Sequence, residues 1–293
     1  MPQRDSTSAL GAYVELTKPR ITGTVVFTAG AGLCLAPVRP TVPVVLLTLA
    51  GTALAVAAAN VLNMYLERDT DALMRRTMRR PLPSGRMEPR RALAFGLLLA
   101  SVSVPLLTFT AGPIPGALAA IALLSYVLVY TPMKRRTAAA LLVGAVAGAI
   151  PPLIGWTAAT GRIDLPGLLL FAVLFLWQVP HFLAITLLRR SEYARAGLIV
   201  QANEPAGEYE VRRNIVLYTV ALIAVSLMFI PLGVGGKVYL VSAVASGALF
   251  LALGLRGLRV ERPERWARKE FLGSLVYLTV LLAVLLLDRS PAF

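Results

Sequence analysis

The feature that most limits the fold of this 293-residue chain is a series of about nine apolar runs. A helix needs about 20 apolar residues to cross the hydrocarbon core of a bilayer, and most of the runs are about that long. They are too long for strands and lack the alternation of a β-barrel strand. We therefore predict an all-α, polytopic membrane protein of about nine transmembrane helices. The runs cover residues 21–38, 41–64, 92–112, 114–130, 138–158, 165–188, 214–233, 237–255 and 270–288.

The composition and the distribution of charge agree with this prediction. Hydrophobic residues make up 57% of the chain and charged residues 15%, against about 45–50% and about 25% in soluble domains. The net charge of +14 is typical of nucleic-acid-binding proteins, but 25 of the 29 lysines and arginines fall in the loops on the N-terminal side of the predicted membrane. The positive-inside rule explains this bias. It predicts a cytoplasmic N-terminus in the cell inner membrane, and we expect no nucleic-acid partner.

Three segments follow from these assignments. Residues 1–20 contain no apolar run, so we expect a cytoplasmic N-terminal segment without a cleavable signal peptide. Residues 21–288 form a single transmembrane domain, and residues 289–293 form a short tail. The longest predicted cytoplasmic loops lie near residues 67–91 and 189–213, so we expect the chemistry on the cytoplasmic side.

An acidic stretch, ANVLNMYLERDTD, ends the second apolar run. If the helix continues through it, offsets of 3, 7 and 11 residues place four polar side chains on one face. These are Asn60, Asn63, Glu67 and Asp71. Polar groups at such depth usually face a cavity, and carboxylate and amide oxygens suit Mg²⁺, which binds through one or two carboxylates and substrate phosphates.

Arg75, Arg76, Arg79 and Arg80 follow within about two turns. Guanidinium groups bind phosphate oxygens through paired hydrogen bonds, so an acidic face beside arginines suggests a diphosphate bridged by Mg²⁺. An equally good interpretation from spacing alone is that the acidic residues pair with arginines at a solvated helix end.

Two further motifs stand out, one where the fourth run meets the cytoplasm and one late in the sixth run. Tyr130 and Lys134 end the fourth run, where a tyrosine anchor and a basic cluster are ordinary features. The sixth run contains Trp177, Gln178 and His181 within one turn. A single buried histidine is more often structural than catalytic, but an ionisable group inside a membrane is a functional candidate by default.

At these residues the chain resembles the UbiA superfamily of intramembrane prenyltransferases, and within it the branch that farnesylates haem. The superfamily motif NxxxDxxxD matches Asn63, Glu67 and Asp71, with Glu in place of the central Asp. The YxxxK element matches Tyr130 and Lys134. LTKPRIT near the start, RRPLPSG after the acidic motif, and WQVPHF followed by SEYARAG are similar to the haem branch. The resemblance covers nearly the whole chain.

The resemblance implies that farnesyl diphosphate and haem B react to give haem O and diphosphate. Asn63, Glu67 and Asp71 would hold Mg²⁺, with Mn²⁺ as an alternative. The diphosphate would be bound by Arg75, Arg79, Lys134 and Tyr130. Haem would contact Trp177, Gln178 and His181, the last as axial ligand or as base for the incoming water. Membrane lipid surrounds such an enzyme, and a haem A synthase or terminal oxidase assembly would receive the product.

One departure concerns the loop after the sixth run. Superfamily members that act on quinone precursors carry a second Asp-rich motif there, whereas this chain has Glu192 as its one acid, preceded by Ser191. Glu192 is therefore expected to contact one metal ion or an arginine.

Two alternatives remain open from the sequence. A sister enzyme would prenylate a phenolic quinone precursor, but the WQVPHF motif and the thin second acidic motif favour haem. A small-molecule transporter would show repeated halves and polar groups at mid-membrane, whereas here the polar groups cluster at the cytoplasmic edge.

Overall fold

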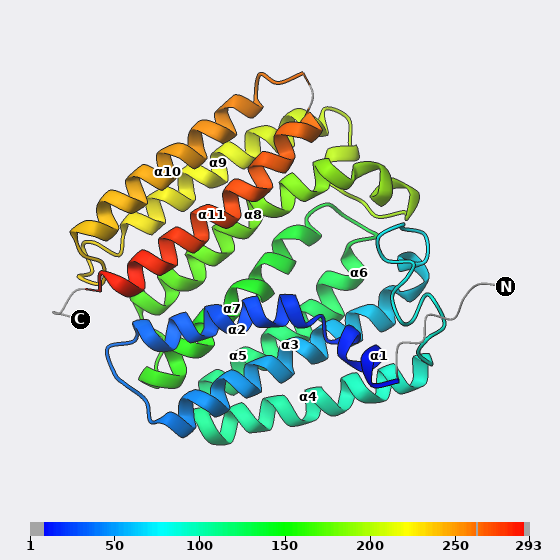
Figure 1. Cartoon of the computed structure of the whole chain (residues 1–293), viewed down its shortest axis with the longest axis horizontal. Coiled ribbons are helices and arrows are strands. Elements are labelled where there is room, and N and C mark those ends of the chain that lie inside the picture. The colour runs from blue at the N-terminus through cyan, green and yellow to red at the C-terminus, as the bar shows by residue number, and fades with distance from the viewer. Residues whose placement is uncertain (1–8, 262, 290–293) are drawn as a thin grey trace.

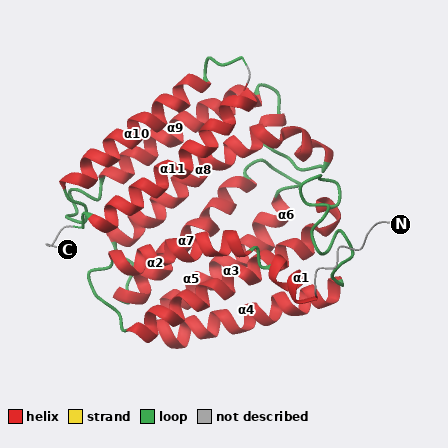
Figure 2. Ribbon diagram, viewed as in Figure 1, coloured by secondary structure: helices red, strands yellow, loops and turns green. Residues whose placement is uncertain are grey.

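The structure, a computed structural model, describes residues 9–261 and 263–289, and all long elements in these ranges are helices. Residues 1–8 of the predicted N-terminal segment, Arg262 of the last predicted cytoplasmic loop and residues 290–293 of the predicted tail lie outside the described residues. The all-helical prediction is confirmed. Figure 2 shows the helices joined by short loops.

The helices follow the predicted apolar runs closely. Their bounds are α1 Ala9–Leu16, α2 Pro19–Leu35, α3 Val42–Asp71, α4 Pro89–Ala111, α5 Pro113–Leu124, the π-helical turn η1 Ser125–Tyr130, α6 Thr131–Met133, α7 Ala140–Thr160, α8 Leu165–Arg195, the 3₁₀ turn η2 Gln201–Asn203, α9 Gly207–Leu227, α10 Lys237–Gly257 and α11 Pro263–Leu287. Elements α5, η1 and α6 form one continuous helical segment. Several helices begin with proline in their first turn. Proline is tolerated there because an N–H group in the first turn has no acceptor within the helix.

Seven of the described helices are long and apolar enough to cross a membrane, so the chain is a multi-pass membrane protein. They are α3, α4, the α5–α6 segment, α7, α8, α10 and α11. Helix α2, with 17 residues, is shorter, and α9 begins with charged residues in its first two turns. Large apolar side chains are exposed on the outside of the bundle, such as Phe109 on α4 and Leu249 on α10, as expected for a surface that faces lipid.

The long helices pack side by side in two groups, as Figure 1 shows. One group contains α2, α3, α4, α5 and α7, and the other contains α8, α9, α10 and α11; α7 packs against α8 where the groups meet. The segment 72–88, α6 and the α8–α9 connection gather at one end of the bundle (Figure 1). The predicted cytoplasmic motifs therefore lie at one end.

Small residues allow a close contact between the backbones of α2 and α7. A Cβ atom on Gly32 would lie 2.0 Å from the carbonyl oxygen of Pro152, and one on Gly155 would lie 1.9 Å from that of Ala29. Glycine is therefore required at both positions, in the manner common between membrane helices. This contact fixes α2, and with it the loop before α2 that enters the site.

Helix α1 was not predicted from the sequence. It packs against α3 and α4 through Ala12 and Leu16, and the ring of Tyr13 meets that of Phe95 at 5.0 Å. The end of the expected N-terminal segment is thus part of the folded domain.

Candidate active site

The polar face predicted for the second run exists, because α3 continues to Asp71. Asn63, Glu67 and Asp71 all line one cavity. The Asn63 and Asp71 side chains are almost fully buried, at 1% exposure each. Asn60 has a different role: its amide donates to the carbonyl oxygen of Thr17 and to the hydroxyl of Thr22, and so ties α3 to the loop before α2.

Each polar group on this face is held by a cation from a different segment. Lys18 Nζ, in the α1–α2 loop, donates to Asn63 Oδ1 at 3.2 Å. Lys134 Nζ, just after α6, lies 2.7 Å from Glu67 Oε1. Arg80 Nη1, in the segment 72–88, lies 2.6 Å from Asp71 Oδ2. Buried charges are costly unless they are paired, so Lys134 and Arg80 compensate the two carboxylates of α3, while Lys18 binds the neutral Asn63 amide.

The pKa values of Lys18 and Lys134 are shifted in opposite directions by these neighbours. Burial, together with repulsion from Arg80 and Lys134, lowers the pKa of Lys18 to about 7. Burial also disfavours the charge of Lys134, but the neighbouring Tyr130 and Glu67 outweigh it and raise the pKa of Lys134 above its ordinary value. Lys134 is therefore a permanent cation at neutral pH, and Lys18 is easily discharged.

A π-helical turn brings Tyr130 and Lys134 to the cavity. Turn η1 precedes α6, and such wide turns often occur at functional sites. Lys134 Nζ lies 4.4 Å from the centre of the Tyr130 ring. Thr131, at the end of the turn, donates to the carbonyl oxygen of Tyr126 and accepts from the Asn63 amide at 3.1 Å. The YxxxK element and the acidic face of α3 therefore share one hydrogen-bonded site.

Of the four arginines that follow the acidic motif, the two that line the cavity are not the two that the resemblance implies as diphosphate contacts. Arg75 and Arg79 are exposed and are not among the cavity-lining residues, whereas Arg76, which is also exposed, and Arg80 line it. The reason is that the chain after α3 is a series of turns, folded back by a hydrogen bond from Thr77 to the carbonyl oxygen of Asp71 at 2.8 Å. Helical spacing could not predict which arginines turn inward.

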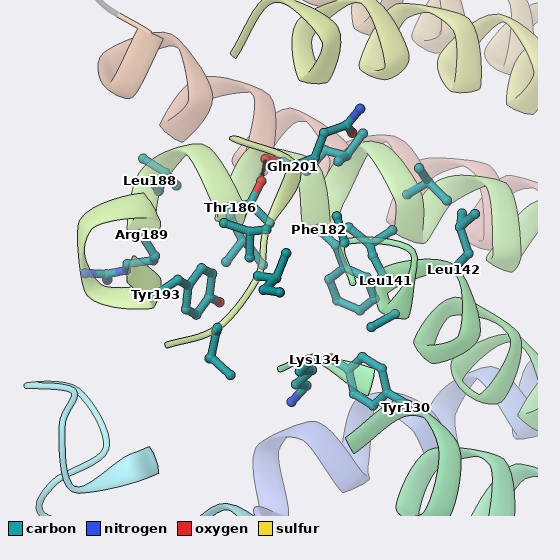
Figure 3. Close-up of a pocket in the computed structure, with 18 of the residues that line it drawn as sticks. Tyr130, Lys134, Leu141, Leu142, Phe182, Thr186, Leu188, Arg189, Tyr193 and Gln201 are labelled. Carbon is teal, nitrogen blue, oxygen red and sulfur yellow. Dashed lines mark hydrogen bonds between the residues drawn. The ribbon is translucent and has the colours of Figure 1, made fainter. Parts of the chain in front are cut away.

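The cavity has a volume of about 720 Å³. Figure 3 shows Lys134 and Tyr130 on one side and α8 on the other. Apolar side chains from α7 and α8 form much of its wall, among them Leu141, Leu142 and Phe182. The far side is formed by polar residues that sequence analysis did not single out, because they come from separate elements: Arg189, Tyr193, Gln201, Asn214 and Tyr218.

The Trp177–His181 motif lies beside the cavity rather than in its lining. Gln178 faces α7 and donates to the carbonyl oxygen of Ala145 at 3.2 Å. Trp177 and His181 face α11 and are stacked, with ring centres 4.8 Å apart. Phe182 and Phe271, which contact the His181 ring, do line the cavity. The histidine is thus separated from the acidic face of α3 by the cavity itself.

Glu192 does not join the acidic face of α3. Its carboxylate lies 3.3 Å from Arg189 Nη1, one turn earlier on α8, and Glu192 is not among the cavity-lining residues. In the described residues no cluster of three or more histidine, cysteine or acidic side chains is present. On the α3 side, the oxygen donors of the cavity are the Glu67 and Asp71 carboxylates and the Asn63 amide, and Glu204, in the α8–α9 connection, is a further carboxylate in its lining.

Solved structures of membrane proteins share the fold of this chain. A structure described as a digeranylgeranylglyceryl phosphate synthase aligns with a TM-score of 0.83 at 18% identity, covering 96% of this chain and 99% of that one. A UbiA homolog from Archaeoglobus fulgidus, solved with GPP and Mg²⁺, aligns with a TM-score of 0.65 at 14% identity over 94% of this chain and 99% of that one. At these identities the likeness concerns the fold.

Sequence comparison is more specific. Residues 25–276 match the UbiA prenyltransferase family, and the chain belongs to that family. Two relatives are named "Protoheme IX farnesyltransferase". The relative from Sorangium cellulosum is 56% identical over 82% of this chain and 86% of its own length. The relative from Myxococcus xanthus is 51% identical over 95% of this chain and 94% of its own length.

Proposed function

We propose that this chain transfers the farnesyl group of farnesyl diphosphate to a vinyl group of haem B, with addition of water, to give haem O and diphosphate. The observation that carries the proposal is the cavity in which the polar face of α3 meets Lys18, Arg80 and Lys134, in a chain that is 51% identical over nearly its full length to a relative named for this activity.

The polar end of the cavity suits a diphosphate. Lys18, Arg80 and Lys134 reach it from three segments, and Arg76 also lines it. Cations that converge in a partly buried site bind phosphate oxygens strongly. Tyr130, whose ring lies against Lys134, is placed to hydrogen-bond the same group. Arg75 and Arg79 remain proposed contacts of the diphosphate, at the exposed edge of the segment 72–88.

The donor set also fits Mg²⁺, or Mn²⁺ in its place. Two carboxylates and an amide on one face of α3 are hard oxygen ligands, and this number suits an ion that completes its coordination with water and substrate phosphates. We propose Asn63, Glu67 and Asp71 as the ligands, with Glu192 as an outer partner through Arg189. When bound, the ion supplies positive charge that stabilises the departing diphosphate.

The residues of the chain then account for the bond changes. The bond between farnesyl C1 and the diphosphate oxygen breaks, and its electron pair leaves with the diphosphate, towards Lys134 and Arg80. The vinyl group attacks farnesyl C1, and the resulting carbocation on the porphyrin side chain takes up water, which loses a proton. Leu141, Leu142 and Phe182 keep water away from the allylic cation before the attack.

We propose that His181 serves this reaction either as axial ligand of the haem iron or as acceptor of the water proton. A neutral imidazole suits both roles. Trp177 stacks on His181, and Gln178 fixes α8 against α7. We propose these two as supports of the haem site.

We further propose nine membrane crossings, a cytoplasmic N-terminus and a cytoplasm-facing site in the inner membrane. Helices α2 and α9 pack within the bundle beside the seven long apolar helices, which supports the two additional crossings. The product would pass to a haem A synthase or a terminal oxidase assembly. Cys34, the one cysteine of the chain, is exposed near the end of α2. It should react with a membrane-impermeant maleimide from outside the cell, whereas cysteine at Ser84 in a Cys34→Ser background should react only from the inside.

The activity is tested by supplying the purified chain in nanodiscs with farnesyl diphosphate, Mg²⁺ and either haem B or 4-hydroxybenzoate. Mass spectrometry should find haem plus one farnesyl group and one water, and no prenylated phenol. Asp71→Asn should abolish the product, and Arg91→Met, at an exposed pair with Glu88, should not. Prenylation of the phenol alone would refute the proposal, as would absence of both products in a folded protein.

A further inference from the structure

The imidazole of His181 is held in place by three aromatic rings. The ring centres of Trp177 and Phe271 lie 4.8 and 4.7 Å from that of His181, and the Trp177 ring is within 25° of parallel to it. Phe182 contacts the imidazole at 5.7 Å. Trp177 and His181 are four residues apart on α8, so both face α11. These contacts fix the plane of the imidazole, and a hydrogen bond sets its protonation.

That hydrogen bond joins His181 to Ser274, a fully buried residue of α11. His181 Nδ1 and Ser274 Oγ are 2.8 Å apart. Ser274 Oγ also lies 2.7 Å from the carbonyl oxygen of Phe271, one turn earlier on the same helix. A carbonyl oxygen can only accept, and a hydroxyl has one proton to donate. Ser274 therefore donates to the carbonyl oxygen of Phe271, and its Oγ accepts a hydrogen bond from His181 Nδ1–H.

The position of Ser274 is fixed by a second contact with α8. The indole N–H of Trp177 donates to the carbonyl oxygen of Ser274 at 2.6 Å. The backbone carbonyl of Ser274 is thus bound by Trp177, while the hydroxyl of Ser274 binds the imidazole of His181. Two residues one turn apart on α8 therefore bind the same residue of α11.

A neutral imidazole with its proton on Nδ1 has a lone pair on Nε2. In the described part of the chain no hydrogen-bond partner is found for His181 Nε2, and that atom is not among the polar atoms sealed from solvent, unlike the carboxylate oxygens of Glu270. Phe182 and Phe271, which flank the imidazole, line the cavity. Within that part of the chain, Nε2 is therefore unpaired and accessible, on a side chain in contact with two residues of the cavity wall.

We propose that Ser274 is a positioning residue: it fixes His181 as the Nδ1–H tautomer and so keeps the Nε2 lone pair for the reaction. The identity of the group that Nε2 contacts rests on the proposed function. Both proposed roles of His181, axial ligand and proton acceptor, use the same lone pair. As a ligand, Nε2 donates it to the haem iron. As a base, Nε2 takes the proton that water loses when its oxygen bonds to the side-chain carbocation, and the imidazole becomes imidazolium.

The chain offers a direct test, because His181 is its one histidine. Protein labelled with ¹⁵N-histidine, purified through a tag without histidine, gives the nitrogen signals of a single imidazole. We expect Nδ1 to show the shift and proton coupling of a protonated nitrogen, and Nε2 those of an unprotonated one. A protonated Nε2 in the neutral ring would overturn the proposal. No substrate is needed, so this result is independent of whether haem or a phenol is prenylated.

Variants connect the tautomer to turnover. Ser274→Ala removes the acceptor, so Nδ1–H loses its partner and the Nε2–H tautomer should become populated. Loss of such an orienting partner typically costs about 10–100-fold in activity. We expect kcat to fall by that factor with the affinity for farnesyl diphosphate unchanged. Ser274→Thr keeps the hydroxyl and should restore both the tautomer and the rate.

Ser226 provides a matched control. It is equally buried, donates to the carbonyl oxygen of Leu222 at 2.7 Å and contacts the hydroxyl of Tyr277 at 3.0 Å. Ser226→Ala should leave both the His181 signals and kcat unchanged. If Ser226→Ala lowers turnover as much as Ser274→Ala does, or if Ser274→Ala retains the Nδ1–H tautomer, Ser274 is a packing residue and the proposal is wrong.

Discussion

Replacing Lys134 by methionine tests whether the polar end of the cavity is a set of mutually compensating charges. Lys134 Nζ and Glu67 Oε1 are 2.7 Å apart, and the two side chains are 22% and 13% exposed. Coulomb attraction at this distance is about 6 kcal/mol at an effective dielectric constant of about 20, most of which is offset by desolvation. Loss of one partner of a buried pair costs about 3–5 kcal/mol, which residual solvent access reduces here to about 2–3 kcal/mol.

We therefore expect Lys134→Met and Glu67→Gln each to lower the free energy of unfolding by about 2–3 kcal/mol. The double variant should lose about 2 kcal/mol less unfolding free energy than the two single losses added together, because neither charge is then left unpaired. Unfolding in mixed micelles of increasing SDS content measures these differences. Arg91→Met, which breaks a pair with Glu88 that is mostly exposed, is the control and should cost less than about 0.5 kcal/mol.

Activity should not follow stability in this series. Removing one preorganised charge at a leaving group costs about 10²–10³ in kcat, so Lys134→Met should lose that factor. The double variant should stay inactive despite its recovered stability, since it lacks both a cation and a carboxylate. The raised pKa of Lys134 means that, as long as Glu67 is ionised, the contribution of Lys134 to stability is constant up to about pH 10 and is lost above it. Fully additive stability losses, or a parental kcat in Lys134→Met, would refute the reasoning.

Three further predictions concern packing, the arginines and the metal. Gly155→Ala should lower the free energy of unfolding by about 1–3 kcal/mol, because its Cβ would strike the carbonyl oxygen of Ala29; Gly23→Ala, with open space around it, should be neutral by the same SDS titration. Arg76→Met and Arg80→Met should raise the Kd for diphosphate, measured by calorimetry, more than Arg75→Met and Arg79→Met do, and equal effects would contradict the arrangement of the segment 72–88. Thorough chelation should remove haem O formation, and Mg²⁺ or Mn²⁺ should restore it; full product yield in chelator would contradict the assignment of Asn63, Glu67 and Asp71.

The sequence predicts the membrane helices well, because each apolar run must form its own backbone hydrogen bonds in lipid. It also predicts the acidic face of α3, since helical spacing places Asn63, Glu67 and Asp71 together. It does not predict α1, because eight residues carry too short an apolar pattern.

Local sequence patterns cannot predict contacts between segments that are distant in the sequence. The π-helical turn before α6 has no simple pattern, and the inward arginines follow from turn geometry after Asp71. His181 meets Ser274, 93 positions further along the chain, and Tyr193 and Asn214 reach the cavity only because α8 and α9 pack beside it. Helical period therefore identifies residues on one element, and tertiary packing decides their partners.

The pairing of charges in the cavity explains how carboxylates and cations can be buried together. Asp71, at 1% exposure, would be costly without a partner, and so would converging cations without an anion. In the structure Arg80 pairs with Asp71 and Lys134 with Glu67, and Lys18 donates to the Asn63 amide. A diphosphate would take over the cations and leave the oxygens of α3 free for a divalent ion, so we expect the two to bind with positive coupling. Calorimetry of each ligand in the presence of the other measures that coupling, and independent binding would show that the cations and the acidic face act separately.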